Sequence, residues 1–237
     1  MKFALIDNRM CDSQTHALGR YTENILRLPP HPLLPAPVAS HPDMLMWIYG
    51  RQVVTYADYI PAAKEVFLRL EGAGYSIVPY EKSPSPQYPF DIALNCATVG
   101  NKIIASQKHM SESIKEISLI RRLQILDVKQ GYAKCSTVVV SDTAIITADA
   151  SIEKTALKAG IDVLKVSPCQ VELDGYNTGF LGGASGTTTD AVIFCGNIDL
   201  HSDATRIKDF CEKHGKQAVS LSDEPLYDYG TIMFLDR

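Results

Sequence analysis

A unit of strand, turn, strand and helix recurs about every forty residues along this chain. The clearest copy spans residues 131–167, where two apolar, β-branched runs, 135–140 and 144–147, flank a Ser-Asp-Thr turn. A helix follows, with Ser151 as its expected N-cap and Gly160 at its end, and a third strand comes after it. Fixed periods of this length are typical of solenoids, propellers and related arrays, so the repeat constrains the fold more strongly than any single motif.

Three further copies are expected, over residues 43–80, 90–128 and 176–222. Their predicted strands include residues 44–49 and 91–99. In the first two copies a Gly-Arg or Gly-Asn pair supplies the turn between the strands. The last of the three begins with an expanded Gly-rich run that lacks the residues of a phosphate-binding loop, and its glycines are expected to let backbones pack closely or to offer N–H groups to an anion.

The two ends of the chain supply a fifth copy. A strand over residues 230–235 has no helix after it, and a strand over residues 2–6 is followed by a predicted helix over 13–28 but has no partner before it. We expect residues 229–237 and 1–28 to combine into one unit. Pairing the first and last strands would close a ring without an exposed sheet edge.

The sequence therefore predicts an α/β fold, namely a pseudo-fivefold α/β propeller of ββα(β) repeats whose ring is closed by the N- and C-terminal strands. Residues 29–42 hold six of the thirteen prolines and are expected to be extended. The segment before them is too short for a core of its own. We therefore interpret residues 29–42 as a strap across a single domain over residues 1–237.

Composition excludes several classes of partner. A formal net charge of −4 argues against a nucleic-acid binder, since there is no basic excess to displace counterions from phosphates. No window approaches eighteen apolar residues, and the N-terminus carries charges too early for a signal peptide, so we expect a cytoplasmic protein with no membrane contact. The six scattered cysteines form no CxxC pair, which suits reduced thiols, and we expect neither a metal nor another cofactor.

Five ββα-type units in a ring resemble the α/β propeller of the pentein superfamily of guanidino-group-modifying enzymes. That superfamily includes arginine and agmatine deiminases, dimethylarginine hydrolases and amidinotransferases. The resemblance covers essentially the whole chain and rests on the repeat more than on a diagnostic motif. The segments TGFLGGASG and CGNIDLHSD are most similar to an uncharacterised branch of the superfamily.

The resemblance implies a reaction in which a Cys thiolate attacks a guanidinium carbon, a His moves protons and acidic side chains hold the cation. In the family the Cys enters the last strand after a Gly-rich turn. That place here reads DYGTIMFLD and offers Thr231 and Met233 but no Cys. The nearest counterpart of the family's His segment, residues 175–178, has no His. The segment GYAKCST resembles the approach to the nucleophile, but in a different repeat.

Three residues are the candidates for catalysis. Cys135 would be the nucleophile, because Lys134 beside it could lower the pKa of its thiol, or it is a small buried apolar residue. His201 would move protons, since it lies between carboxylates, or it is an exposed loop residue. Asp149 would orient the cation, or it is a charge at a helix N-terminus.

Five further residues are candidates for holding a substrate at the mouth of the ring. Asn95 and Asn177 stand among apolar neighbours and need hydrogen-bond partners. Asp142 binds a ligand or forms the Ser-Asp-Thr turn. Asp7 and Arg9 follow the first strand and either line the mouth or belong to a solvated loop.

Together these features predict binding of a small polar, arginine-like compound. One hypothesis is an enzyme that hydrolyses a guanidino or amidino compound, or transfers a group from it, through a Cys nucleophile. The other is a catalytically inactive binding protein of the same fold, which the missing C-terminal Cys favours. Whether the chain assembles into a homo-oligomer stays open at this point.

Overall fold

The computed structural model describes residues 3–235, so the outermost two residues of the predicted terminal repeat at each chain end lie outside it. Within that range the strands form five three-stranded sheets. The bounds of the strands, sheet by sheet, are β15 (Met233–Leu235), β1 (Phe3–Asp7) and β2 (Asn24–Leu28); β3 (Met46–Tyr49), β4 (Gln52–Tyr56) and β5 (Ser76–Tyr80); β6 (Ala97–Val99), β7 (Lys102–Ala105) and β8 (Gln124–Asp127); β9 (Thr137–Ser141), β10 (Ala144–Thr147) and β11 (Asp162–Lys165); β12 (Ser185–Thr187), β13 (Ala191–Phe194) and β14 (Gln217–Ser220).

All five sheets have the same topology. The middle strand pairs antiparallel with one neighbour and parallel with the other, and a helix connects the two parallel strands. In one sheet the antiparallel neighbour of β1 is β15, so both chain ends do form one unit, as predicted. The connecting helices are α1 (Asp12–Leu18), α3 (Lys64–Gly72), α4 (Glu112–Arg121), α5 (Ala150–Lys158) and α6 (Ala204–Lys213).

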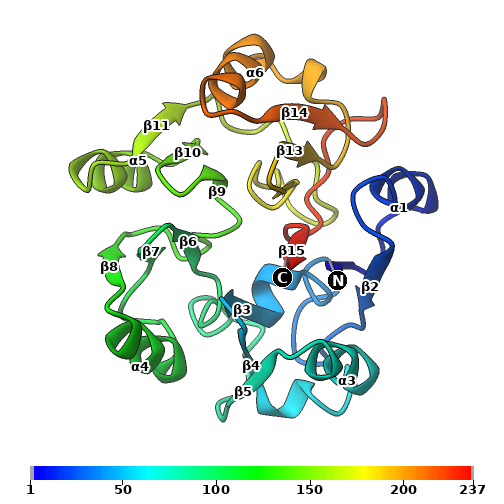
Figure 1. Ribbon diagram of the computed structural model, residues 1–237, viewed down its shortest axis with the longest axis vertical. Helices are drawn as coiled ribbons and strands as arrows, with labels where there is room; N and C mark the ends of the chain where they lie inside the picture. Colours follow the sequence, from blue (N-terminus) through cyan, green and yellow to red (C-terminus); the bar gives the residue numbers. More distant parts are fainter. Residues whose placement is uncertain (1–2, 236–237) are drawn as a thin grey trace.

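Figure 1 shows the five sheets around the middle of the molecule, with these helices on the outside. Apolar composition explains the layering, because β1, β10 and β13 are buried along their whole length. Each helix presents one buried stripe to the sheets; in α5 the stripe includes Ile152 and Ala156. In the part of the chain that the structure describes, no helix is long and apolar enough to cross a membrane.

Several predicted elements differ from the structure. The helix predicted over residues 13–28 is α1 followed by β2, because Leu26 and Leu28 alternate toward the core and pair with β1. The strand predicted over 91–99 is reduced to β6, and the one over 44–49 begins as the short helix α2 (Pro42–Leu45). Pro42 at the start of α2 suits a first helical turn, where its missing N–H costs nothing.

The proline-rich strap is a series of turns and not an extended segment. Backbone hydrogen bonds run from Leu34 to His31, from Val38 to Pro35 and from His41 to Val38. Proline suits such turns because its fixed φ matches their second position. His41, near the end of the strap, lies in the interior of the protein and is 1% exposed.

Candidate functional site

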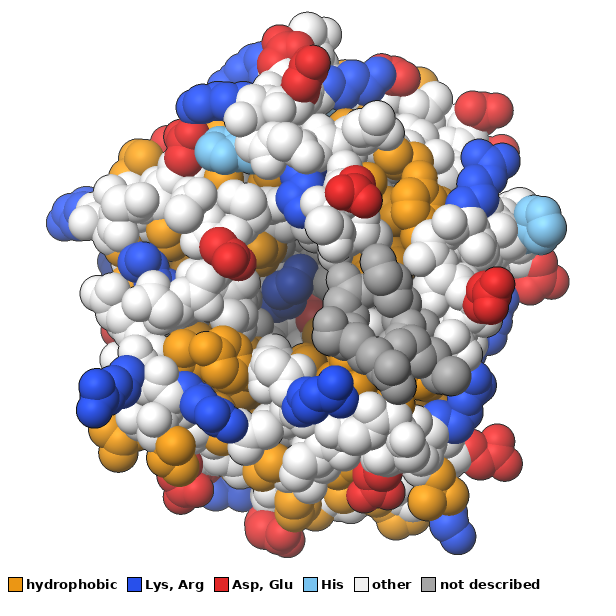
Figure 2. Space-filling view, viewed as in Figure 1, with side chains coloured by type: hydrophobic (Ala, Val, Ile, Leu, Met, Phe, Trp, Pro, Cys, Tyr) orange, Lys and Arg blue, Asp and Glu red, His pale blue; other side chains and the backbone are white. Residues whose placement is uncertain are grey.

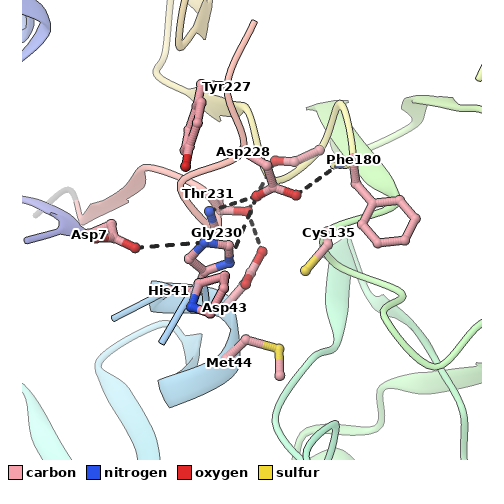
Figure 3. Close-up of polar contacts among 12 residues, drawn as sticks. Asp7, His41, Asp43, Met44, Cys135, Phe180, Tyr227, Asp228, Gly230 and Thr231 are labelled. Atoms are coloured by element: carbon pink, nitrogen blue, oxygen red, sulfur yellow. Dashed lines mark hydrogen bonds and ion pairs between the residues drawn. The ribbon is translucent and has the colours of Figure 1, made fainter. Parts of the chain in front are cut away.

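A group of buried polar side chains lies in the middle of the molecule (Figure 3). These residues come from segments that precede four different sheets, since His41 and Asp43 flank the start of α2 before β3, Asn95 precedes β6, Cys135 precedes β9, and Asp228 and Thr231 precede β15. Each is at most 4% exposed. Polar groups buried in this way need partners, so the contacts among them define what the site can do.

Asn95 holds the loop that carries the thiol. Its Oδ1 accepts hydrogen bonds from the backbone N–H groups of Lys134, at 2.7 Å, and Cys135, at 3.3 Å. Its Nδ2 lies 3.0 Å from the Cys135 sulfur and donates to the Asp43 carbonyl oxygen at 3.1 Å. The sulfur points toward the space that His41, Asp43 and Asp228 surround (Figure 3).

The pKa of the Cys135 thiol is raised well above its ordinary value, first by burial and then by the carboxyl groups of Asp43 and Asp228. The sequence predicted the opposite shift from Lys134. The Lys134 ammonium instead lies 3.0 Å from Thr231 Oγ1, and burial lowers its own pKa. The thiol is therefore protonated at neutral pH.

His41 stands between two carboxyl groups. Its Nδ1 lies 3.9 Å from Asp228 Oδ1, and its Nε2 lies 3.7 Å from Asp7 Oδ2. Burial, followed by the charge of Arg9, lowers the pKa of His41 to about 3. The separation from Asp228 would suit an ion pair, but burial disfavours the charge on the imidazole, so His41 is neutral at neutral pH. Nε2 has no hydrogen-bond partner among the residues described.

Asp228 is a buried carboxyl group of the site whose pKa lies near neutrality. Burial, followed by the charge of Asp43, raises the pKa of Asp228 to about 7. The backbone N–H groups of Phe180 and Gly230 donate to it at 2.9 and 2.8 Å. A Cβ at Gly183 would overlap the same carboxyl, so the predicted close packing of the Gly-rich run serves to admit Asp228.

A pocket of about 150 Å³ lies against this group. Cys135, His41 and Asp228 contribute ionisable groups to its lining, and Tyr132 and Phe180 contribute aromatic rings whose centroids lie 6.1 Å apart. The remaining lining residues are Val38, Met44, Leu173, Tyr176 and Thr178. A thiol, an imidazole and a carboxyl group beside aromatic faces can bind a planar cation and react with it.

The other two predicted catalytic residues lie in a neighbouring pocket of about 240 Å³, which shares Thr178 and Phe180 with the first. Asp149, and not Ser151, is the N-cap of α5, where it accepts from the N–H groups of Ser151 and Ile152. His201 is 4% exposed, and its Nδ1 accepts from the Asp203 N–H at 3.0 Å. The structure thus brings His41, and not His201, into the pocket of Cys135.

Of the five predicted substrate-binding residues, three lie at or beside the buried polar group and two lie on the surface. Asn95 contacts Cys135 directly. Asp7 is fully buried, accepts three side-chain hydrogen bonds from Arg9 and lies 3.7 Å from His41 Nε2, so both residues belong to the His41 side of the group. Asp142 is exposed in the turn between β9 and β10, and Asn177 is exposed in the loop before β12.

Sequence reasoning missed His41, Asp43 and Asp228. Their signals were weak, because His41 stands in the proline-rich strap, Asp43 directly follows that strap, and Asp228 stands where the resemblance directed attention to an absent Cys. Within residues 3–235 no three His, Cys, Asp or Glu side chains are arranged to hold a metal ion.

Three comparisons relate this chain to known proteins. The model of a family described as "Family of unknown function (DUF6873)" matches residues 5–233. No curated protein matches the sequence. Among solved structures, a dimethylarginine dimethylaminohydrolase is similar over 94% of this chain and 92% of its own, at 10% identity and a TM-score of 0.57.

Two more solved structures are similar along most of their length. One is an amidinotransferase of the saxitoxin pathway from Microseira wollei, with 14% identity, a TM-score of 0.55, and 94% of this chain and 77% of its own covered. The other is an agmatine deiminase from C. jejuni, with 8% identity, a TM-score of 0.55, and 93% and 87% covered. All three belong to the pentein superfamily, so the predicted resemblance is confirmed in the fold.

Proposed function

We propose that this chain, which belongs to the family of unknown function (DUF6873), binds a small guanidino or amidino compound in the Cys135 pocket and cleaves it through the thiol. The observation that carries the proposal is that Cys135, His41 and Asp228 line one pocket. The names of the similar structures, a dimethylaminohydrolase, an amidinotransferase and a deiminase, support the substrate class. We further propose that the five sheets form one pseudo-fivefold propeller domain.

The chemistry around the pocket suits a guanidinium cation. Asp228 lines the pocket, and Asp43 is fully buried behind that lining, close enough to raise the pKa values of Asp228 and Cys135. Both carboxyl groups have raised pKa values, and one oxygen of Asp43 has no hydrogen-bond partner in the described chain. A planar cation with several N–H donors would supply the missing partner and favour the ionised carboxylates. Its positive charge would also lower the pKa of the Cys135 thiol, so that binding itself prepares the nucleophile.

Hydrolysis then requires two transfers. The thiol proton passes to the His41–Asp228 pair, the sulfur bonds to the guanidinium carbon, and a C–N bond breaks as the departing amine takes that proton. Water next attacks the carbon of the resulting S-alkylthiouronium intermediate and gives a proton to the same pair. The C–S bond breaks, the pair returns that proton to the sulfur, and the proton that the guanidinium ion carried ends on the departed amine, so that a guanidinium ion and water give a urea and an ammonium ion. Asp228, with a pKa of about 7, suits such transfers at neutral pH.

The test is incubation of the full chain with arginine, agmatine and methylated arginines, with assays for citrulline, ornithine, urea and ammonia. Turnover by the wild type that is lost in Cys135→Ala and Cys135→Ser supports the proposal. Turnover that survives both substitutions excludes Cys135 as the nucleophile. If nothing turns over while a guanidine raises the melting temperature, the inactive binding protein is the better account, since a ligand of the native state must stabilise it.

A further inference from the structure

A second pocket, of about 340 Å³, lies in the middle of the molecule between the sheets. It shares no described lining residue with the Cys135 pocket. Figure 2 shows the hollow in the middle of the face that it views. The antiparallel strand of every sheet contributes to its wall, for example Trp47 of β3, Thr98 of β6, Val139 of β9, Gly186 of β12 and Phe234 of β15. The pocket is therefore built by the whole arrangement of sheets and not by one loop.

The charge of this second pocket comes from Lys134 alone among its described lining residues, none of which is acidic. Within residues 3–235, no carboxylate oxygen lies within 4.0 Å of the Lys134 ammonium. Its contacts are with Thr231 Oγ1, at 3.0 Å, and the Thr137 carbonyl oxygen, at 3.5 Å. An ammonium has three donors, so at least one remains for a ligand.

Thr98 offers a second donor in the same wall. Its Oγ1 accepts from the Trp47 indole N–H at 3.0 Å, and the described residues provide no acceptor for its own hydrogen. By contrast, the hydroxyls of Ser185 and Thr187 already donate to carbonyl oxygens. Two donors, one of them charged, suit the two oxygens of a carboxylate better than the larger set of acceptors on a phosphate.

We propose that this pocket binds a small organic carboxylate, whose charged end pairs with Lys134 and whose apolar body packs against Trp47 and the neighbouring apolar side chains. Trp47, Ile48, Ile232 and Met233 supply that apolar wall. Its size exceeds that of the Cys135 pocket and admits a ring-sized body. The site is separate from the proposed guanidino site and takes a ligand of the opposite charge.

The chain contains its own reporter for this site. Trp47 is the sole tryptophan of the sequence, so tryptophan emission monitors this pocket. Cyclohexanecarboxylate does not absorb light at the wavelengths that excite the indole, so it can be titrated into the full chain at neutral pH without obscuring the emission. We expect a saturable change in emission, and binding at least about tenfold weaker for the neutral isostere cyclohexanecarboxamide. Equal binding of the two compounds, or no response to the carboxylate, would overturn the proposal.

Substitutions assign the response to Lys134. Lys134→Met should weaken carboxylate binding at least about tenfold, whereas Lys154→Met, which removes an exposed lysine on α5, should leave it unchanged. Val139→Phe puts a larger side chain into the same wall, which fills part of the pocket, and it should also abolish binding. It replaces Lys134→Met as the test if circular dichroism shows that Lys134→Met does not fold. Unchanged binding in a folded Lys134→Met or in Val139→Phe contradicts the site. Inorganic phosphate binding in place of the carboxylate contradicts the ligand class.

Discussion

The side-chain amide of Asn95 contacts Cys135 at two points, since Oδ1 accepts the Cys135 backbone N–H at 3.3 Å and Nδ2 lies 3.0 Å from its sulfur. The same Oδ1 accepts from Lys134 N–H, and the same Nδ2 donates to the Asp43 carbonyl oxygen. One buried side chain therefore joins the segments before three sheets and sets the position of the thiol.

Asn95→Ala should destabilise the protein by about 3 kcal/mol, because it leaves two N–H groups and a carbonyl oxygen buried without partners. Urea unfolding monitored by circular dichroism measures the change. Asn8→Ala, at an exposed position, is the matched control and should change stability by less than about 0.5 kcal/mol. A loss at Asn95 no larger than that at Asn8 would show that these contacts do not hold the loop.

His41→Gln should lower turnover of a guanidino substrate by about 100-fold or more, because it removes the imidazole that shares the pocket with Cys135. The melting-temperature shift caused by the substrate should persist, since Asp43 and Asp228 remain. His201→Gln is the comparison, because the sequence predicted that residue for the same role. If His201→Gln loses turnover and His41→Gln keeps it, protons move through the neighbouring pocket.

The stability of the free protein should depend on Asp228 between about pH 4 and pH 7. The pKa of Asp228 is raised from 3.8 to about 7, so across this range the native state holds a proton that the unfolded chain has lost. The contribution of Asp228 to stability is therefore complete below pH 3.8, the pKa in the unfolded chain, and is lost as the pH rises through about 7, the pKa in the native state.

His41 acts in the opposite direction, because its pKa is lowered from 6.5 to about 3 and its contribution is lost as the pH falls. Asp228→Asn removes one of the effects that oppose that of His41, so the free energy of unfolding should rise with pH more steeply than in the wild type, by up to about 1.4 kcal/mol per pH unit. Unfolding by urea at several pH values tests this. Asp190→Asn, at an exposed carboxyl group, should keep the wild-type slope.

Gly230→Ala should unfold the site. Gly230 has a φ of +67°, and a Cβ there would overlap His41 Cβ, so both the backbone and the packing oppose the substitution. We expect a loss of about 3 kcal/mol, measured by thermal and urea unfolding. Gly72→Ala, in α3 with open space around its Cα, should instead be neutral or stabilising by up to about 1 kcal/mol. Equal effects of the two substitutions would contradict this account of the turn.

The repeat was legible in the sequence because its signals are local. Turn glycines such as Gly50 and Gly100, both with a φ of +57°, flanked by β-branched runs, reveal strand pairs without knowledge of the rest of the chain. Such local signals do not predict an element whose conformation depends on the strand with which it pairs. The stretch that became β2 has apolar spacing compatible with a helix, and only pairing with β1 makes it a strand.

By itself, the sequence determined the five-unit pattern, the joining of the chain ends and the prominence of Cys135 and Asn95. The tertiary structure decided which residues surround the thiol, since His41, Asp43 and Asp228 stand far from it in the chain and meet only where the sheets converge. It also decided the direction of the pKa shift of Cys135. A neighbour such as Lys134 is visible in a sequence, whereas burial and the carboxyl groups that reverse its effect arise only from packing.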